Sequence, residues 1–385
     1  MNVTNRRSTT RPPGLLAALV GAALLALVLV ALTGRGESGL RTWWGPGSPQ
    51  QQSSADSRLL VRVSGNQLVN GAGSPVRFLG ANRSGTEYAC QEGFGFFDGP
   101  VDDAAIEAMK SWKMTAVRVN LNESCWLGLP DAKLRYAGDA YQRNITDLVN
   151  RINAHGMYVI LDLHWNPRGQ DSPTDQQAMP DRLHAASFWA GVATRFKDNP
   201  AVVFDLYNEP YPDGNRNSTA AWTCVRDGGT CKGVRFEAAG MQELVDAVRS
   251  TGATNVIMVA GPQYAGVVDR WLEFKPADPA NQLAASVHIY GPGYAPCSAP
   301  ACWDAQIAPL AATVPVVMGE IGPYRLCSHD FVDELTDWAD AHSISYLAWS
   351  WIAGDCAKGP SLIQDYGGTP SPYGTGFRKH LSSLP

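Results

Sequence analysis

Short runs of Val, Ile and Leu alternate with amphipathic segments through most of the chain. Such apolar runs are typical of buried strands, and apolar residues at helical spacing are typical of helices that pack on them. The predicted strands cover residues 76–81, 116–120, 158–164, 201–206, 256–260, 285–290, 314–320 and 345–351. The predicted helices cover residues 102–112, 141–154, 183–196, 235–250, 267–274, 303–312, 331–342 and 373–381.

The order of these elements predicts an α/β fold. Eight strand–helix units in single file, over about 325 residues, favour a closed (β/α)8 TIM barrel, because an open doubly wound sheet of that size usually splits into halves. No Gly-x-Gly-x-x-Gly follows the first strand, which argues against a dinucleotide-binding fold. Before that strand, two alternating segments joined by Ser64-Gly65-Asn66 predict an N-terminal β-hairpin.

The N-terminal segment has a different composition from the rest. Residues 1–14 are basic, and residues 15–33 are uncharged and almost wholly apolar. In a helix this apolar run spans about 28 Å, which predicts an uncleaved transmembrane anchor in the cell membrane with the later chain outside the cytoplasm. A cleaved signal peptide, and hence a secreted protein, is the alternative. Residues 34–57 are typical of a flexible linker, and residues 58–385 form the predicted barrel domain.

Net charge and cysteine usage narrow the function classes. A formal net charge of −5 provides no basic field for a phosphate backbone, so nucleic acid is not an expected partner. The eight cysteines lack the spacing of a zinc site, and in an exported protein they predict disulfides. Sequence alone does not determine their connectivity. The close pairs are Cys224/Cys231 and Cys297/Cys302, and the nearest remaining partners are Cys90/Cys125 and Cys327/Cys356.

Chemically capable side chains stand at the ends of the predicted strands, and barrel closure brings these ends to one mouth. Glu209 follows the fourth strand and Glu320 closes the seventh, so two carboxylates face each other across a cleft. Glycoside hydrolysis needs such a pair. The alternative, a glutamate that only pairs with a neighbouring loop, leaves the other strand ends unexplained. The other chemically capable residues at strand ends are Arg118, His164, Asn208, His288, Tyr290 and Trp349.

Six short motifs carry a resemblance to a known family. In chain order they are Val117-Arg118-Val119, Leu163-His164, Tyr207-Asn208-Glu209-Pro210, His288-Ile289-Tyr290, Met318-Gly319-Glu320 and Ala348-Trp349-Ser350-Trp351. Over residues 59–385 the chain resembles glycoside hydrolase family 5, the cellulase family of the retaining barrel clan. The resemblance implies that Glu209 is the acid/base, that Glu320 is the nucleophile and that Asn208 contacts the substrate's 2-hydroxyl.

The physical chemistry of the other strand ends agrees with these roles. Arg118 can reach Glu320 and favour its ionised form, and Tyr290 can donate a hydrogen bond to Glu320. His164 and His288 can orient the carboxyl groups or a sugar hydroxyl. Trp349 is the expected floor of the sugar subsite. Trp351 either shares that role or packs in the barrel. Trp126, Trp165 and Trp303 lie in loops, where each either stacks on a sugar ring or simply packs against the protein.

The expected activity is retaining hydrolysis of a β-linked glucan, mannan or related polysaccharide through a covalent intermediate. No cofactor motif or metal cluster appears in the sequence, and this mechanism needs neither. Two departures from the family pattern leave the substrate open. Asn120 stands where many relatives carry Pro, and Ile352-Ala353-Gly354 follows the last Trp motif without the lysine that some cellulases place nearby. The alternatives are a transglycosylase of the same fold and a catalytically inactive barrel that binds carbohydrate at the cell surface. Retention of both glutamates with Arg118 and Tyr290 argues against the inactive barrel.

Overall fold

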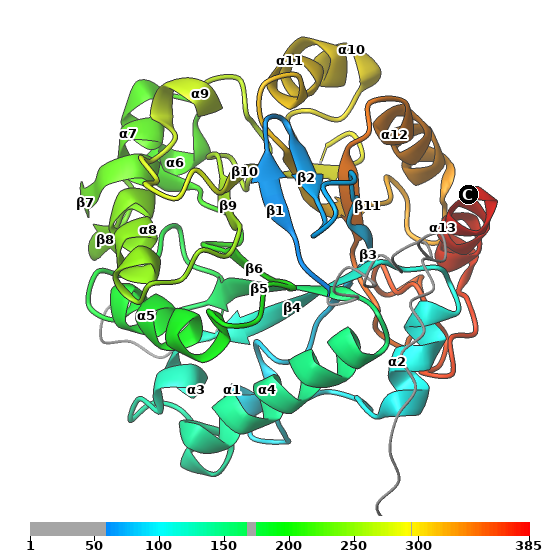
Figure 1. Ribbon diagram of the computed structural model, residues 1–385, viewed down its shortest axis with the longest axis horizontal. Coiled ribbons are helices and arrows are strands. Elements are labelled where there is room, and N and C mark those ends of the chain that lie inside the picture. Colours follow the sequence, from blue (N-terminus) through cyan, green and yellow to red (C-terminus); the bar gives the residue numbers. More distant parts are fainter. Residues whose placement is uncertain (1–58, 168–174, 294) are drawn as a thin grey trace, which may run out of the picture. The chain divides into compact units, whose positions relative to one another are not determined.

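The computed structural model describes residues 59–167, 175–293 and 295–385. Eight parallel strands of this part close into a barrel, with helices arranged around it (Figure 1), which confirms the predicted barrel. In the order in which the next sentence names them, each strand hydrogen-bonds to the one that follows, and the last strand hydrogen-bonds to the first. The strands are β3 (Leu79–Arg83), β4 (Ala116–Asn122), β5 (Tyr158–Trp165), β6 (Val202–Asp205), β9 (Ile257–Ala260), β10 (Leu283–Tyr290), β11 (Val316–Gly322) and β12 (Ser345–Ala348).

Amphipathic helices bury their apolar faces against the barrel. In α4, for example, Tyr141, Ile145, Leu148 and Ile152 are buried at helical spacing. The longer helices are α2 (Asp103–Lys110), α4 (Asp139–Ala154), α5 (Ala185–Phe196), α7 (Thr219–Asp227), α8 (Met241–Ser250), α12 (Asp330–Ala341) and α13 (Pro372–Ser383). The short ones are α1 (Ala89–Glu92), α3 (Glu123–Leu127), η1 (Leu134–Tyr136), α6 (Pro212–Asn215), α9 (Trp271–Phe274), α10 (Pro300–Cys302), η2 (Trp303–Ile307) and α11 (Ala308–Ala311).

Three predicted elements differ most from the structure. The helix expected to begin at residue 235 begins at Met241, because β8 (Glu237–Ala239) pairs with β7 (Gly228–Thr230) instead. The helix expected over residues 267–274 covers only Trp271–Phe274. The eighth strand ends at Ala348, and the peptide bond that follows Trp349 is cis.

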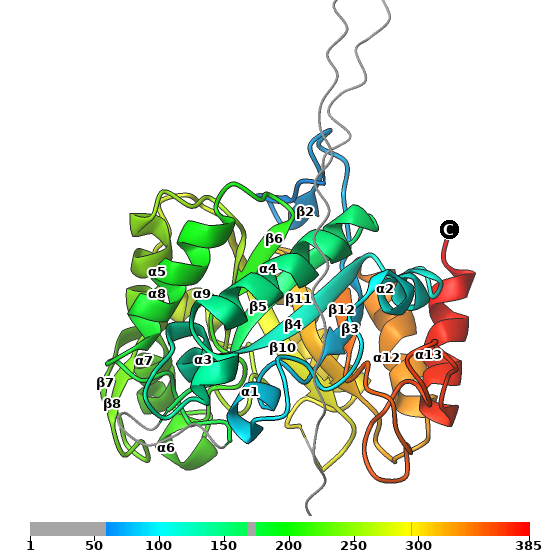
Figure 2. The same cartoon turned by 90° about the horizontal axis from the view of Figure 1, so that it is seen from below.

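The predicted hairpin is present and lies at one end of the barrel. It consists of β1 (Arg62–Ser64) and β2 (Gln67–Val69), and Val61 and Leu68 pack with Phe78 in an apolar cluster at that end. Figure 2 shows the hairpin on one side, and α1, α6 and the long connections that follow the strands on the other. The hairpin end is therefore closed by apolar packing, which leaves the opposite end for the chemistry.

All four expected cysteine pairs form disulfides. The bonds are Cys90–Cys125, Cys224–Cys231, Cys297–Cys302 and Cys327–Cys356. Each of these cysteines lies in a connection that follows a barrel strand, on the side opposite the hairpin. The disulfides therefore hold the long connections that surround the barrel mouth.

The predicted basic segment, membrane anchor and linker, residues 1–57, lie outside the described residues. Within the described part of the chain, no helix combines the length and apolar character needed to cross a membrane.

Candidate active site

The two glutamates meet at the barrel mouth, as expected. Glu209 follows β6, and Glu320 lies in β11 where the pairing of β11 with both neighbouring strands shifts in register. Such irregularities re-aim a side chain, and they are common beside active sites. One carboxylate oxygen of Glu209 and one of Glu320 lie within 4.8 Å of each other. The Glu209 side chain is 17% exposed and that of Glu320 is 4% exposed, so both carboxyl groups are largely buried.

Arg118 in β4 is the centre of the charged network. Its guanidinium is fully buried, and its Nη1 donates to Oε1 of Glu320 at 3.0 Å. A planar guanidinium can satisfy several oxygens at once and so positions them relative to one another. Its other partners, all within 3.1 Å, are Asp162, Asp205, Asn82 and Asn208.

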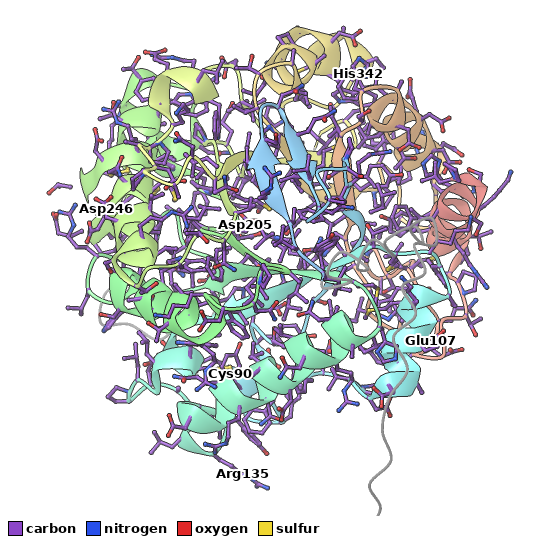
Figure 3. All side chains as sticks on the ribbon, in the orientation of Figure 1. Cys90, Glu107, Arg135, Asp205, Asp246 and His342 are labelled. Atoms are coloured by element: carbon purple, nitrogen blue, oxygen red, sulfur yellow. A yellow bond between two sulfur atoms is a disulfide. The ribbon has the colours of Figure 1, made fainter. Side chains whose placement is uncertain are left out.

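The two buried aspartates beside Arg118 have different pKa values. Burial would raise the pKa of Asp162, but Arg118 and His164 outweigh it and hold that pKa below its usual range. Burial raises the pKa of Asp205 to about 7, although Arg118 opposes the shift. Figure 3 places Asp205 inside the ring of helices, whereas Glu107 lies at the rim. The lowered pKa of Asp162 favours a carboxylate there, whereas Asp205 can take up a proton near neutral pH.

Glu320 accepts a second hydrogen bond, from Tyr290. The Tyr290 hydroxyl donates to Oε2 of Glu320 at 2.5 Å. Burial, followed by the charges of Glu320 and Glu209, raises the pKa of Tyr290 well above its usual value, so the phenol keeps the proton that it donates. Both oxygens of Glu320 thus accept from a fixed donor, as an ionised carboxylate requires.

Glu209 has a less charged environment. Its Oε1 lies 2.9 Å from Nδ1 of His288, and Nε2 of Gln176 donates to its Oε2 at 3.2 Å. Burial raises the pKa of Glu209, an effect that the bond from Gln176 and the charges of His164 and Arg118 oppose. Burial also lowers the pKa of His288 to about 3, so this ring is neutral. Burial therefore favours the protonated form of Glu209 and the neutral form of His288.

An open cavity of about 300 Å³ lies over the two carboxylates. His164 and Trp349 stack in it with parallel rings, 5.4 Å between centroids, and Nδ1 of His164 bonds to Asp162. His164 therefore supports Trp349, which is half-buried and lines the cavity. Its lining residues are His164, Gln176, Asn208, Glu209, Tyr264, Tyr290, Glu320 and Trp349.

The three suggested tryptophan platforms do not line this cavity. Trp126 is 1% exposed, and its ring packs against Phe188. Trp303 is fully buried, and its indole N–H donates to the carbonyl of Cys297. Both side chains pack inside the protein, because no face of either indole ring is left exposed for a sugar. Trp165 is half-buried near Tyr88. Trp351 is buried against Trp112 and so belongs to the core.

Sequence reasoning missed several site residues. Asp162, Asp205 and Asn82 are polar residues within strands that are otherwise mostly apolar, a signal that could have identified them. Gln176 and Tyr264 lie in connections, where no periodicity singles them out. Tyr264 is 40% exposed and packs on Tyr211, 4.6 Å between ring centroids, at the edge of the cavity.

Three groups of potential metal ligands lie close together in the described part of the chain, although no spacing in the sequence indicated them. In each group, ligand atoms lie within 4.8 Å of one another. The first includes Cys327 and Cys356, whose sulfurs are already joined in a disulfide. The second is the site itself. The third is separate from the site and consists of Glu123, Asp181 and His184.

Comparison with known proteins decides the family. Residues 69–355 match the family model described as "Cellulase (glycosyl hydrolase family 5)". The chain belongs to glycosyl hydrolase family 5. It is therefore a glycoside hydrolase.

Relatives of this family 5 hydrolase include the endoglucanase of Paenibacillus polymyxa, 23% identical over 83% of this chain and 86% of the relative. Endoglucanase 3 of Humicola insolens is 32% identical over 46% of this chain, and the match spans 40% of that protein's length. Among solved structures, a beta-glucanase of Saccharophagus degradans in complex with cellotetraose shares the fold. Its TM-score is 0.63 at 20% identity, over 88% of this chain and 98% of that one.

Proposed function

We propose that this family 5 hydrolase is a retaining β-glycosidase that cleaves a β-linked glucan by double displacement. The separation of the two carboxyl groups carries the proposal. Retaining enzymes hold them about 5–5.5 Å apart, whereas inverting enzymes need about 6.5–9.5 Å to admit a water molecule. An approach within 4.8 Å between oxygens of Glu209 and Glu320 supports the retaining geometry.

In the first step, Glu320 attacks the anomeric carbon while Glu209 protonates the leaving oxygen. The raised pKa of Glu209 favours its acid form, and the two donors on Glu320 favour a carboxylate there. Departure of the leaving sugar removes the proton from Glu209, which then acts as the base that activates water. Water attacks the glycosyl-enzyme from the face that the first sugar left, so the product keeps the β configuration.

The proposed substrate class is a β-1,4-linked glucan. The relatives are named endoglucanases, and the similar beta-glucanase of Saccharophagus degradans binds cellotetraose. The open cavity with Trp349 beside the carboxylates suits a flat sugar ring in an extended chain. A relative named Beta-mannanase/endoglucanase A, from Caldicellulosiruptor saccharolyticus, is 22% identical over 72% of this chain and makes mannan the second substrate to compare.

Two alanine variants test the assignment. We expect Glu320→Ala to lose more than about 10³-fold in kcat on every substrate, because no glycosyl-enzyme forms. We expect Glu209→Ala to keep the first step on a dinitrophenyl β-cellobioside, whose leaving group needs no proton. Added azide should then release the β-glycosyl azide from Glu209→Ala. Glu107→Ala, an exposed carboxylate at the rim, is the matched control.

The configuration of the first-formed product, read by NMR, is the second measurement. An α product, or near-normal activity in Glu320→Ala, would overturn the mechanism. Assays on carboxymethylcellulose, mixed-linkage β-glucan and mannan identify the substrate. Products longer than the substrate would indicate transglycosylation, and binding to these glycans without turnover would indicate an inactive barrel.

A further inference from the structure

Glu123, Asp181 and His184 form a fixed cluster outside the active-site cavity. Glu123 is the first residue of α3, directly after β4, and Asp181 and His184 lie just before α5. Figures 1 and 2 both show α3 next to α5. The cluster backbone is well anchored: Asp181 bridges to Ala238 of β8, and its Oδ1 accepts from the backbone N–H of His184 at 3.0 Å.

Three of the four carboxylate oxygens of this cluster are buried without a hydrogen-bond donor. Glu123 is 0% exposed and Asp181 is 1% exposed. Neither oxygen of Glu123 has a hydrogen-bond partner among the described residues, and neither does Oδ2 of Asp181. No Lys or Arg of the described part forms an ion pair with Glu123. Buried carboxylates of this kind are costly unless a cation or a proton compensates them.

A shared proton is the simpler compensation, and it satisfies only part of the cluster. Burial, followed by the charge of Asp181 and, once Glu123 is protonated, a side-chain hydrogen bond to it, raises the pKa of Glu123 well above its usual value, so one proton can sit between the two carboxyl groups. That proton makes one hydrogen bond and leaves the second oxygen of Glu123 unpaired. A cation between the side chains would bind both carboxylates and the imidazole together.

We propose that Glu123, Asp181 and His184 bind one divalent cation of the Zn²⁺ or Mn²⁺ class. The imidazole favours these ions over Ca²⁺ and Mg²⁺, which prefer oxygen ligands alone. The three ligand atoms lie within 4.8 Å of one another, and Nδ1 of His184 is hydrogen-bonded to Oδ1 of Asp181 at 2.9 Å. Ligands held at about 2.1 Å from one ion stand roughly 3.0–3.4 Å apart, so the ion would displace the proton of that hydrogen bond and draw Glu123 closer. This site is independent of the proposed glycosidase mechanism.

The position of the site suggests what the ion does. It would join the connection after β4 to the connection after β5. Burial first, and then the charges of Tyr211, Glu123 and Asp181, raise the pKa of the buried Tyr207 phenol. Tyr207 precedes Asn208 and Glu209 in the chain and donates to the carbonyl of Gln177 at 2.7 Å. The ion is therefore a structural brace behind the acid/base residue.

The test measures metal binding directly in the full-length protein. Metal content after purification is determined by mass spectrometry, and chelator-treated protein is titrated with ZnCl₂ and MnCl₂ by calorimetry. We expect about one ion per chain and a higher Tm with the ion, because an ion that binds only the folded state stabilises it. Glu123→Gln keeps the shape of the side chain and should weaken binding at least about 30-fold, with loss of the Tm increase.

The active site offers a second group of ligands, so Glu209→Gln is the matched control and should bind the ion as the unchanged protein does. If Glu123→Gln does not fold, His184→Ala replaces it, because that side chain is partly exposed. Binding that survives Glu123→Gln but is lost in Glu209→Gln would overturn the proposal. So would Zn²⁺ and Mn²⁺ binding weaker than about 100 µM, or tight binding of Ca²⁺ alone.

Discussion

Single residues divide the chemistry of the mouth between its two glutamates. Glu320 receives hydrogen bonds from Arg118 and Tyr290, whereas Glu209 contacts the neutral ring of His288 and the amide of Gln176. The charged donor and the phenol lie on one carboxyl group, and the uncharged partners on the other. Two chemically identical side chains are thereby prepared for different steps.

Gln176 adjusts the pKa of Glu209, and this effect can be tested. Its bond to Oε2 stabilises the charged form and opposes the rise in pKa that burial causes. Gln176→Leu keeps the volume but removes the donor, so the pKa of Glu209 should rise further. Activity needs protonated Glu209 and declines as pH rises through that pKa. The alkaline limb of kcat/KM should therefore move to higher pH.

The pH profile of Glu107→Ala serves as the reference for this variant. An alkaline limb that stays in place, or moves to lower pH in Gln176→Leu, would show that Gln176 does not stabilise the charged form of Glu209. Gln176 also accepts from Nδ2 of Asn208 at 3.0 Å, so a rise in KM without a shift of the limb would assign it to substrate positioning instead.

Residue-level prediction from sequence succeeded where a motif and a strand end coincided. Glu209, Glu320 and Arg118 stand at or in apolar strands, so barrel closure alone brings them together. Asp205 was not identified, because its contact with Arg118 depends on which strands are neighbours and on which side of β6 it points. For Trp126, sequence left sugar platform and loop packing open, because a position in a connection does not reveal burial.

At the level of elements, the four disulfides differ mainly in the length of chain that they close. Cys327–Cys356 spans 29 residues and ties the connection after β11 to that after β12, whereas Cys297–Cys302 spans 5 residues within one connection. The entropy of loop closure in the unfolded chain gives about 3.6 kcal/mol for the longer loop and about 2.2 kcal/mol for the shorter. The longer disulfide should therefore stabilise the fold more.

Double serine variants of each pair test this difference. Removing Cys327–Cys356 should lower the free energy of unfolding by about 1.4 kcal/mol more than removing Cys297–Cys302, measured by chemical denaturation. The shorter pair is the matched control, since both lie around the same mouth. Equal losses would show that the contribution comes from native contacts and not from the unfolded chain.

Element types could be predicted from the sequence because strands and helices here have strong apolar periodicity. The wrongly predicted boundaries arise from contacts between segments that are distant in the sequence. Residues 237–239 lie in a segment compatible with a helix, yet their backbone pairs with β7 and with Asp181. No local pattern reveals that these residues pair with β7 earlier in the same connection and with Asp181 in the connection after β5. For the same reason, the sequence did not predict that Glu123 lies close to Asp181.

On the scale of the whole molecule, we propose that residues 15–33 hold the full-length chain in the cell membrane with the barrel outside. The basic flank and the long apolar run motivate this proposal. Full-length protein should sediment with membranes, resist extraction at high pH and dissolve in detergent. A variant that begins at residue 34 behind a cleavable leader is the control and should be soluble. N-terminal sequencing that finds a mature chain starting near residue 34 would contradict the anchor.

The placement of the disulfides has a practical consequence for protein engineering. A connection closed at its base by a disulfide holds its own ends at a fixed spacing, whatever sequence lies between them. The short segment between Cys297 and Cys302, which forms no strand, is thus a position where the sequence can be exchanged. A new recognition loop can be introduced there. The hairpin end of the barrel, which contributes apolar packing and no chemistry, does not need to change.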